Sequence, residues 1–146
     1  AGEKLSPARI AELLELVELE AGIATRMPDA LSGGQRQRVG VARALAGDPH
    51  LLLMDEPFGA LDPVTRDALG GRVRKLHDEL GLTTIMVTHD MAEALLLADR
   101  VLVMDAGAIV ADETPQALLE GLGGAVAQEL AAVPRAQADR LAELAR

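Results

Sequence analysis

Two acidic residues close an apolar run, and their position suggests what they could do. The run is LLLMDE, which ends in Asp55 and Glu56. Adjacent residues of an extended chain point to opposite sides, and Pro57 favours an extended backbone at Glu56, so the two carboxylates suit different tasks. One could hold Mg²⁺ through its water shell while the other polarises an attacking water. A strand that merely ends in a polar turn explains the same residues, and the pattern alone leaves both interpretations open.

A second candidate is the start of a helix in the stretch LSGGQ. Ser32, Gly33 and Gly34 provide free backbone N–H groups, the positive end of a helix dipole and little side-chain bulk, which together suit a phosphate. An ordinary N-cap accounts for the same three residues. A third candidate is His89, which follows a β-branched run; it could bind a phosphate or a water there, or it could be a surface residue of a strand-to-helix turn.

Helices that must position these residues can be predicted from apolar spacing and capping residues. Each of the first four expected helices begins at a Ser or Asp, in two cases followed directly by Pro, which is typical of an N-cap and a first helical residue. We expect helices from Ser6-Pro7 to Gly22, from Ser32 to Gly47-Asp48-Pro49, from Asp62-Pro63 to about Leu80, and from Asp90, where Glu93 occupies the capping-box position.

Two short apolar runs, residues 51–54 and 83–88, are typical of strands. The first is continuously apolar, which predicts a strand covered on both faces. Because strands alternate with helices, the sequence predicts an α/β fold with parallel strands and crossover helices. Ligands of such sheets bind outside the carboxyl ends of the strands, where Asp55, Glu56 and His89 are expected.

The C-terminal part predicts a hairpin and further helices. Residues 101–104 and 108–110 would form the hairpin, with a three-residue loop between them. Thr114-Pro115 would cap a short helix, and the stretch 121–124 is the one candidate linker. After it we expect one or two helices broken at Pro134.

Composition excludes several classes of partner. The chain carries 23 acids and 14 bases, for a formal net charge of −9. A chain of this charge is repelled by duplex nucleic acid and by anionic lipid. We therefore expect no nucleic-acid partner, and the absence of cysteine is compatible with a reducing compartment.

Taken in order, the motifs LSGGQ, apolar-DE, GALD and THD resemble the second half of the nucleotide-binding domain of ABC transporters, a P-loop NTPase-like fold. The resemblance implies that Asp55 is the Mg²⁺-associated acid of Walker B, Glu56 the catalytic base and His89 the switch residue that senses the γ-phosphate of ATP. It also implies a lid over the ATP of a second ATPase subunit in a head-to-tail dimer, made by Ser32, Gly33, Gly34 and Gln35. Asp62 would contact that partner subunit, although it serves equally well as an N-cap before Pro63.

The phosphate-binding pattern G-x-x-x-x-G-K-[ST] does not occur in the sequence, and neither Lys4 nor Lys75 follows such a loop. We therefore expect a piece of a larger subunit: residues 1–120 from the C-terminal portion of the ATPase domain, and residues 121–146 as a helical tail. Alone, the chain should bind ATP poorly and hydrolyse it negligibly.

Within the family, the stretches LLMDEPFGALDPVTR and VTHDMAEAL resemble the ATPase subunits of importers for osmoprotectants such as glycine betaine or choline. The resemblance implies permease subunits in the membrane, indirectly a solute-binding protein, and a peripheral location at the cytoplasmic face of the plasma membrane. A second hypothesis stays open, in which a truncated, non-catalytic paralogue donates its LSGGQ to a partner. Chromosome-associated ABC ATPases are disfavoured by the acidic charge and the lack of long heptads.

Overall fold

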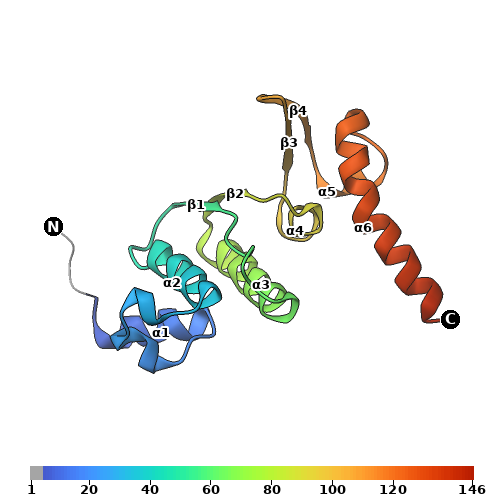
Figure 1. Cartoon of the computed structure of the whole chain (residues 1–146). Coiled ribbons are helices and arrows are strands. Elements are labelled where there is room, and N and C mark those ends of the chain that lie inside the picture. Colours follow the sequence, from blue (N-terminus) through green and yellow to red (C-terminus); the bar gives the residue numbers. More distant parts are fainter. Residues whose placement is uncertain (1–4) are drawn as a thin grey trace. The chain divides into compact units, whose positions relative to one another are not determined.

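The computed structural model describes residues 5–146 of the 146-residue chain. Contacts divide the chain into two compact units, Ala1–Val87 (unit 1) and Thr88–Arg146 (unit 2), and each is described by itself (Figure 1). The sequence-based boundary after residue 120 marks where the family's ATPase domain would end, which is a different question from how the chain divides into compact units. That boundary stays a prediction.

Unit 1 is built on two parallel strands, as the alternation of strands and helices predicts. β1 pairs with β2 in a register that runs from Leu51 opposite Thr83 to Asp55 opposite Val87. The most buried side chains of the unit include Val17, Leu52, Phe58 and Leu69. Its elements are α1 (Pro7–Leu16), the 3-10 turns η1 (Ala21–Thr25) and η2 (Pro28–Ala30), α2 (Gly33–Leu45), β1 (Leu51–Asp55), α3 (Pro63–Leu80) and β2 (Thr83–Val87).

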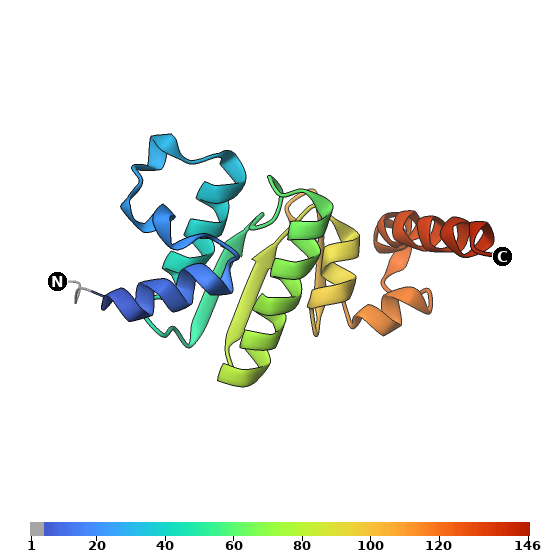
Figure 2. The same cartoon turned by 90° about the horizontal axis from the view of Figure 1, so that it is seen from below.

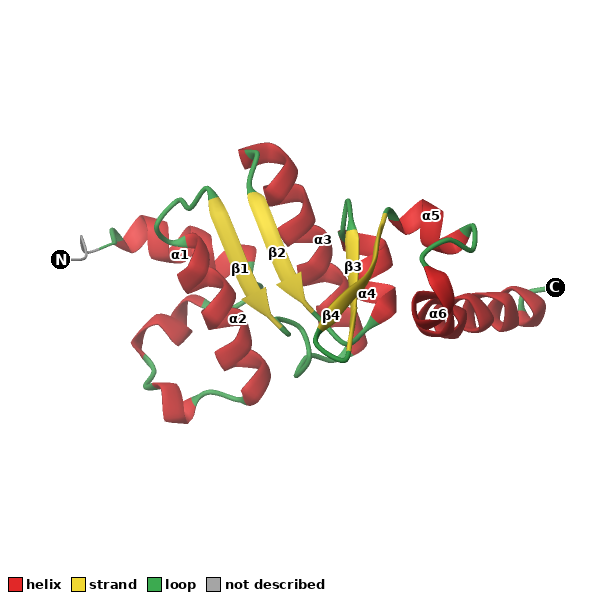
Figure 3. Cartoon of the chain, turned by 90° about the horizontal axis from the view of Figure 1, so that it is seen from above, coloured by secondary structure: helices red, strands yellow, loops and turns green. Residues whose placement is uncertain are grey.

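The sheet of unit 1 is covered on one face only, and the expectation of a strand buried on both faces was wrong. Figures 2 and 3 show α1, α2 and α3 on the same side of β1 and β2. Leu52 is 2% exposed on the covered side, whereas Leu53 is 65% exposed on the other. Because side chains alternate along a strand, helices on a single side bury every second residue. Within the described residues of unit 1, the other face of the sheet stays open.

α1 begins as expected but ends earlier. Ser6 is its N-cap and accepts a hydrogen bond from the Arg9 N–H at 3.1 Å. The helix stops at Leu16 rather than near Gly22, because Glu18 takes a left-handed conformation with φ 55° that reverses the chain. Arg38 donates to the Glu18 carbonyl at 2.8 Å and Arg72 pairs with its carboxylate at 2.9 Å. Tertiary contacts therefore fix this helix end.

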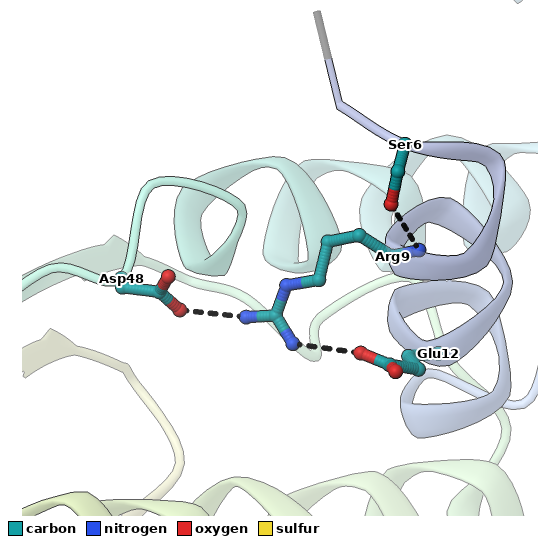
Figure 4. Close-up of polar contacts among 4 residues, drawn as sticks. All are labelled: Ser6, Arg9, Glu12 and Asp48. Atoms are coloured by element: carbon teal, nitrogen blue, oxygen red, sulfur yellow. Dashed lines mark hydrogen bonds and ion pairs between the residues drawn. The ribbon is translucent and has the colours of Figure 1, made fainter. Parts of the chain in front are cut away.

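An arginine also ties α1 to the turn that precedes β1. The Arg9 guanidinium contacts Glu12 at 3.2 Å on its own helix and Asp48 at 2.7 Å in the turn after α2 (Figure 4). Asp48 has a positive φ of 46°. The pair lies at the surface, so its contribution to stability is about 1 kcal/mol or less.

Unit 2 packs three helices with a hairpin: α4 (Met91–Leu97), β3 (Val101–Asp105), β4 (Ala108–Glu113), α5 (Pro115–Leu119) and α6 (Gly124–Leu144). Asp90 caps α4 and Thr114 caps α5, as expected. A small core holds the unit together and draws on both strands and on α5 and α6. Its buried members are Val101, Val103, Ala111, Leu118 and Ala127.

The hairpin is confirmed, but its turn is shorter than the expected three residues. Asp105 pairs with Ala108, which leaves only Ala106 (φ 46°) and Gly107 (φ 81°) in the turn. Positive φ at both positions is the geometry that matches the twist of a two-residue hairpin. The hairpin contains one unpaired residue within β4 as well. The register shifts between Val103 and Met104, and Val110 forms a β-bulge there.

Two further expectations for the C-terminus were wrong. α6 runs unbroken from Gly124 to Leu144 through Pro134, which removes only one helical N–H. Arg135 supports the helix beside it, since its guanidinium donates to the Ala131 carbonyl at 3.2 Å and to the Gln128 side chain at 2.7 Å. The stretch 121–124 is a tight turn rather than a linker. It packs so closely on α5 that a Cβ on Gly123 would lie 2.9 Å from the Leu118 side chain. Across residues 5–146, no helix has the length and apolar character needed to span a bilayer.

Candidate functional site

The two acids lie at the carboxyl end of β1, as the sequence predicts. Asp55 is the last residue of the strand, and the Glu56 N–H extends the ladder by donating to the Val87 carbonyl at 2.8 Å. Both acids are exposed. Solvent and ligands can therefore reach both carboxylates.

Glu56 is not extended, which corrects the expectation drawn from Pro57. Its φ is +44°, in the left-handed region. Proline at the next position disfavours the right-handed helical region for Glu56, yet the chain must turn immediately after the ladder. The left-handed conformation meets both demands, and the Gly59 N–H closes the turn on the Glu56 carbonyl at 3.3 Å. Such strain in a residue other than glycine costs roughly 1–3 kcal/mol and often marks a functional site.

The loop that follows Glu56 is anchored at several points. Phe58 is 1% exposed and Leu61 is 7% exposed, so both side chains belong to the core. Gln37 of α2 reaches across to the loop: its Nε2 donates to the Glu56 carbonyl, and its Oε1 accepts the Ala60 N–H at 2.9 Å. Sequence reasoning missed Gln37, although it lies three residues after Gly34 and therefore on the same face of the helix.

The helix start at Ser32 forms a complete capping box. The Ser32 hydroxyl accepts the Gln35 N–H at 3.2 Å, and the Gln35 side chain accepts the Ser32 N–H at 2.9 Å. Gly33 is exposed and has open space where a Cβ would stand, so a ligand could approach its backbone. At Gly34 a Cβ would lie 3.2 Å from a Leu61 methyl group, which places the helix start against the loop after Glu56.

Asp62 caps α3. Its carboxylate accepts the N–H groups of Val64 at 3.1 Å and Thr65 at 3.0 Å, and the Thr65 hydroxyl at 2.7 Å. The Thr65 hydroxyl, followed by these backbone donors, lowers the pKa of Asp62 below its ordinary value of 3.8. Asp62 is thus a charged N-cap with an exposed side chain. The capping interpretation is confirmed, and a contact with a partner subunit stays a prediction.

His89 belongs to unit 2 and is exposed between two structured neighbours. The Thr88 hydroxyl donates to Glu93 at 2.7 Å and accepts the Asp90 N–H at 3.0 Å. Asp90 in turn caps α4 through the N–H groups of Ala92 and Glu93. The backbone on both sides of His89 is therefore held by hydrogen bonds within unit 2.

Unit 1 thus brings the Ser32–Gln35 helix start beside the loop between Glu56 and Asp62. Among residues 5–146, no three His, Cys, Asp or Glu side chains form a group that could hold a metal by themselves. Mg²⁺ usually keeps several waters and takes only one or two protein carboxylates. The exposed carboxylate of Asp55 fits such a partial contribution.

Comparison with known proteins identifies the family. A family model described as ABC transporter matches residues 3–59. The glycine betaine uptake system ATP-binding protein YehX of Escherichia coli (strain K12) is 56% identical over 111 residues, which cover 76% of this chain. The chain belongs to the ABC transporter family. It spans about a third of the length of the curated relatives it matches, 36% in the case of YehX.

Other relatives of this ABC transporter chain are named for the transport of different solutes. The carnitine transport ATP-binding protein OpuCA of Listeria monocytogenes is 53% identical over 117 residues, which cover 80% of this chain and 30% of OpuCA. The sulfate/thiosulfate import ATP-binding protein CysA 2 of Agrobacterium fabrum is 57% identical over 109 residues, 75% of this chain and 32% of CysA 2. High identity is thus shared with importer proteins of more than one solute class.

A solved structure confirms the α/β fold expected for an ABC transporter ATP-binding domain. The ATP-binding cassette MJ0796, in a dimeric post-hydrolysis state bound to ADP and Pi, matches with a TM-score of 0.72 and 37% identity. The match covers 78% of this chain and 50% of the MJ0796 chain. The family and the α/β fold expected from the LSGGQ, DE, GALD and THD motifs are therefore confirmed.

Proposed function

We propose that this chain forms part of the ATP-binding subunit of an ABC importer and contributes to the ATP hydrolysis that drives solute uptake. The observation that carries the proposal is that the capped helix start at Ser32–Gln35 lies against the loop between Glu56 and Asp62. The family resemblance gives both segments roles at ATP, and in this chain Gly34 and Gln37 join them directly.

In this proposal each site residue has one task. Asp55 helps to hold Mg²⁺, which when bound neutralises phosphate charge. Glu56 accepts the proton of the attacking water, and its exposed position allows a water to reach it. His89 senses the γ-phosphate of ATP. The remaining residues act on a second ATPase subunit: Ser32, Gly33, Gly34 and Gln35 cover its ATP, and Asp62 contacts that subunit.

The general-base role can be tested in a complete subunit. Since the chain matches 111 residues of YehX, a YehX chimera that carries this segment supplies the rest of an ATPase. Glu56→Gln in that chimera should lower ATP turnover by at least about 100-fold while Mg-ATP binding stays within about twofold. Glu79→Gln, a matched change at an exposed helix position, should leave turnover unchanged. Normal turnover of the Glu56→Gln chimera would exclude the role.

We further propose that the transported solute is an osmoprotectant such as glycine betaine, choline or carnitine. The support is that YehX is named for glycine betaine uptake and OpuCA for carnitine transport, whereas CysA 2 is named for sulfate and thiosulfate import. Permease subunits and a solute-binding protein would complete the importer, with this chain at the cytoplasmic face of the membrane. Deleting its gene should abolish the uptake of labelled glycine betaine at high salinity and leave sulfate uptake unchanged. Loss of sulfate uptake with normal glycine betaine uptake would show that the solute is sulfate.

A second candidate function is a non-catalytic module that lends its LSGGQ segment to an intact partner. It is favoured by the complete LSGGQ segment, whose helix start carries an intact capping box at Ser32 and Gln35. The chain alone should then bind no Mg-ATP, yet stimulate an intact ATPase subunit when added to it. Ser32→Arg should abolish that stimulation, because a long cation would obstruct the lid. Tight ATP binding with turnover by the chain alone would exclude this second candidate.

A further inference from the structure

Gln37 makes a two-point contact with the loop that carries Glu56. Its side-chain amide donates to the Glu56 carbonyl at 2.5 Å and accepts the Ala60 N–H at 2.9 Å. A carbonyl can only accept and an N–H can only donate, so the two loop groups determine the orientation of the amide. One side chain of α2 thus spans the turn formed by Pro57, Phe58 and Gly59.

This contact acts on a strained residue. The left-handed φ of Glu56 persists only where surrounding contacts over-determine it. The Glu56 N–H is held by the Val87 carbonyl at 2.8 Å, and its carbonyl is held by Gln37 and by the Gly59 N–H. Both ends of the Glu56 backbone are therefore tied, one to β2 and the other to α2. That backbone sets the direction in which the Cα–Cβ bond of Glu56 leaves the chain, and so the region that its carboxylate can reach.

We infer that Gln37 is a positioning residue for the hydrolytic reaction: its amide fixes the backbone of Glu56 and so directs the carboxylate toward the attacking water. The inference rests on the proposed role of Glu56. A second consequence concerns the helix start, because Gln37 follows Gly34 by one turn and Gly34 packs on Leu61. The Ser32–Gln35 helix start and the loop after Glu56 are therefore in contact through Gly34 as well as through Gln37.

The contact itself can be tested in the 146-residue chain by native-state amide exchange. Gln37→Met keeps the length of the side chain and removes both hydrogen bonds. The exchange rate of the Ala60 amide should rise by about five- to tenfold, the effect of one hydrogen bond of ordinary strength. Gln37→Glu keeps the acceptor for the Ala60 N–H and should raise the rate less. An Ala60 rate unchanged by Gln37→Met would overturn the inference.

Two internal controls accompany this exchange experiment. The Thr65 amide, held by Asp62 at 3.0 Å, should exchange at the same rate in every variant. Gln116→Met removes an exposed glutamine whose amide donates to Glu120 at 2.7 Å, and it should leave Ala60 unchanged. If the Thr65 rate rises with the Ala60 rate in Gln37→Met, the loss is general destabilisation and the positioning role is rejected.

The catalytic consequence is measured in the YehX chimera. Gln37→Met should lower kcat by about tenfold or more and leave the Kd for Mg-ATP within about twofold. Gln37→Glu should not recover kcat, because a carboxylate cannot donate to the Glu56 carbonyl. Added to Glu56→Gln, Gln37→Met should lower turnover no further, since both changes act through one carboxylate. An additional, independent loss would overturn the inference. If Glu56→Gln alone leaves turnover intact, the proposed function fails, while the Ala60 exchange still decides whether Gln37 fixes the loop.

Discussion

The Thr88 hydroxyl donates a 2.7 Å hydrogen bond to the carboxylate of Glu93, the one charged residue found buried among residues 5–146. The same hydroxyl accepts the Asp90 N–H at 3.0 Å. The Thr88 side chain therefore provides one hydrogen bond to a buried carboxylate and also fixes the backbone after His89. A carboxylate is retained in such a place only when hydrogen bonds compensate its lost hydration.

Removing that hydroxyl should be costly. Thr88→Val keeps the shape of the side chain and leaves the Glu93 carboxylate with one donor fewer, so unfolding should be easier by about 1–3 kcal/mol. Thr88→Ser keeps the hydroxyl and should lose less than about 1 kcal/mol. Urea unfolding followed by circular dichroism measures both variants. Equal stability of the Val and Ser variants would show that the hydroxyl does not stabilise Glu93.

Gly123 should not tolerate a side chain. Its φ is 93°, and a Cβ would lie 2.9 Å from a Leu118 methyl group and 3.1 Å from the Cβ of Ala127. Gly123→Ala should therefore destabilise unit 2 by about 1–3 kcal/mol, since an overpacked site and a left-handed backbone both oppose it. Gly71→Ala is the matched control: it is exposed within α3, nothing lies within 4 Å of its Cβ, and it should stabilise by about 0.5–1 kcal/mol. The same thermal shift in both variants would contradict the packing argument.

Leu52 and Leu53 are neighbours of the same type on opposite faces of β1. Leu52 is 2% exposed and Leu53 is 65% exposed. In this chain Leu52→Ala should cost about 2–5 kcal/mol, whereas Leu53→Ala should stay within about 0.5 kcal/mol. Chemical unfolding of the two variants side by side measures the difference. A comparable loss from Leu53→Ala would mean that the open face of the sheet is covered in solution.

The carboxyl group of Asp62 should titrate below its ordinary pKa of 3.8, because the Thr65 hydroxyl and two backbone N–H groups stabilise its charged form. The folded chain then binds this proton less tightly than the unfolded chain. The contribution to stability is complete above about pH 4 and is lost as the pH falls through the folded pKa. Carbon-13 NMR of the carboxyl group measures the pKa directly.

Thr65 provides the control for that titration. Thr65→Val removes the hydroxyl donor and should move the pKa of Asp62 upward, toward 3.8. Thr65→Ser keeps the donor and should leave the pKa low. A pKa that is insensitive to Thr65→Val would assign the lowering to the backbone N–H groups alone.

Local sequence predicted the beginnings of elements well. Ser6, Ser32, Asp62, Asp90 and Thr114 all cap helices where expected. A cap satisfies backbone donors two or three residues away, so the information lies within one turn. The parallel pairing of β1 with β2 also follows from the order of the elements, because a helix between two strands leads naturally to a parallel pair.

Sequence reasoning failed where distant residues decide the outcome. The end of α1 depends on Arg38 and Arg72, which bind Glu18 from α2 and α3. The other two failures have causes nearer in the sequence. Arg135 contacts Ala131 and Gln128 on its own helix beside Pro134, and a bulge at Val110 in β4 accompanies the two-residue turn of the hairpin.

The sequence by itself determined the family of this chain, because LSGGQ, the acids after the apolar run, GALD and His89 are identifiable from residue type and order alone. Only the tertiary structure decided how the unit 1 motifs are joined. Gln37 contacts Glu56 from 19 residues away in the sequence and Ala60 from 23 residues away. The backbone takes a left-handed conformation at Glu56, directly after β1. Hydrogen bonds act through space, and their partners become neighbours only after α2 packs beside the loop that follows β1.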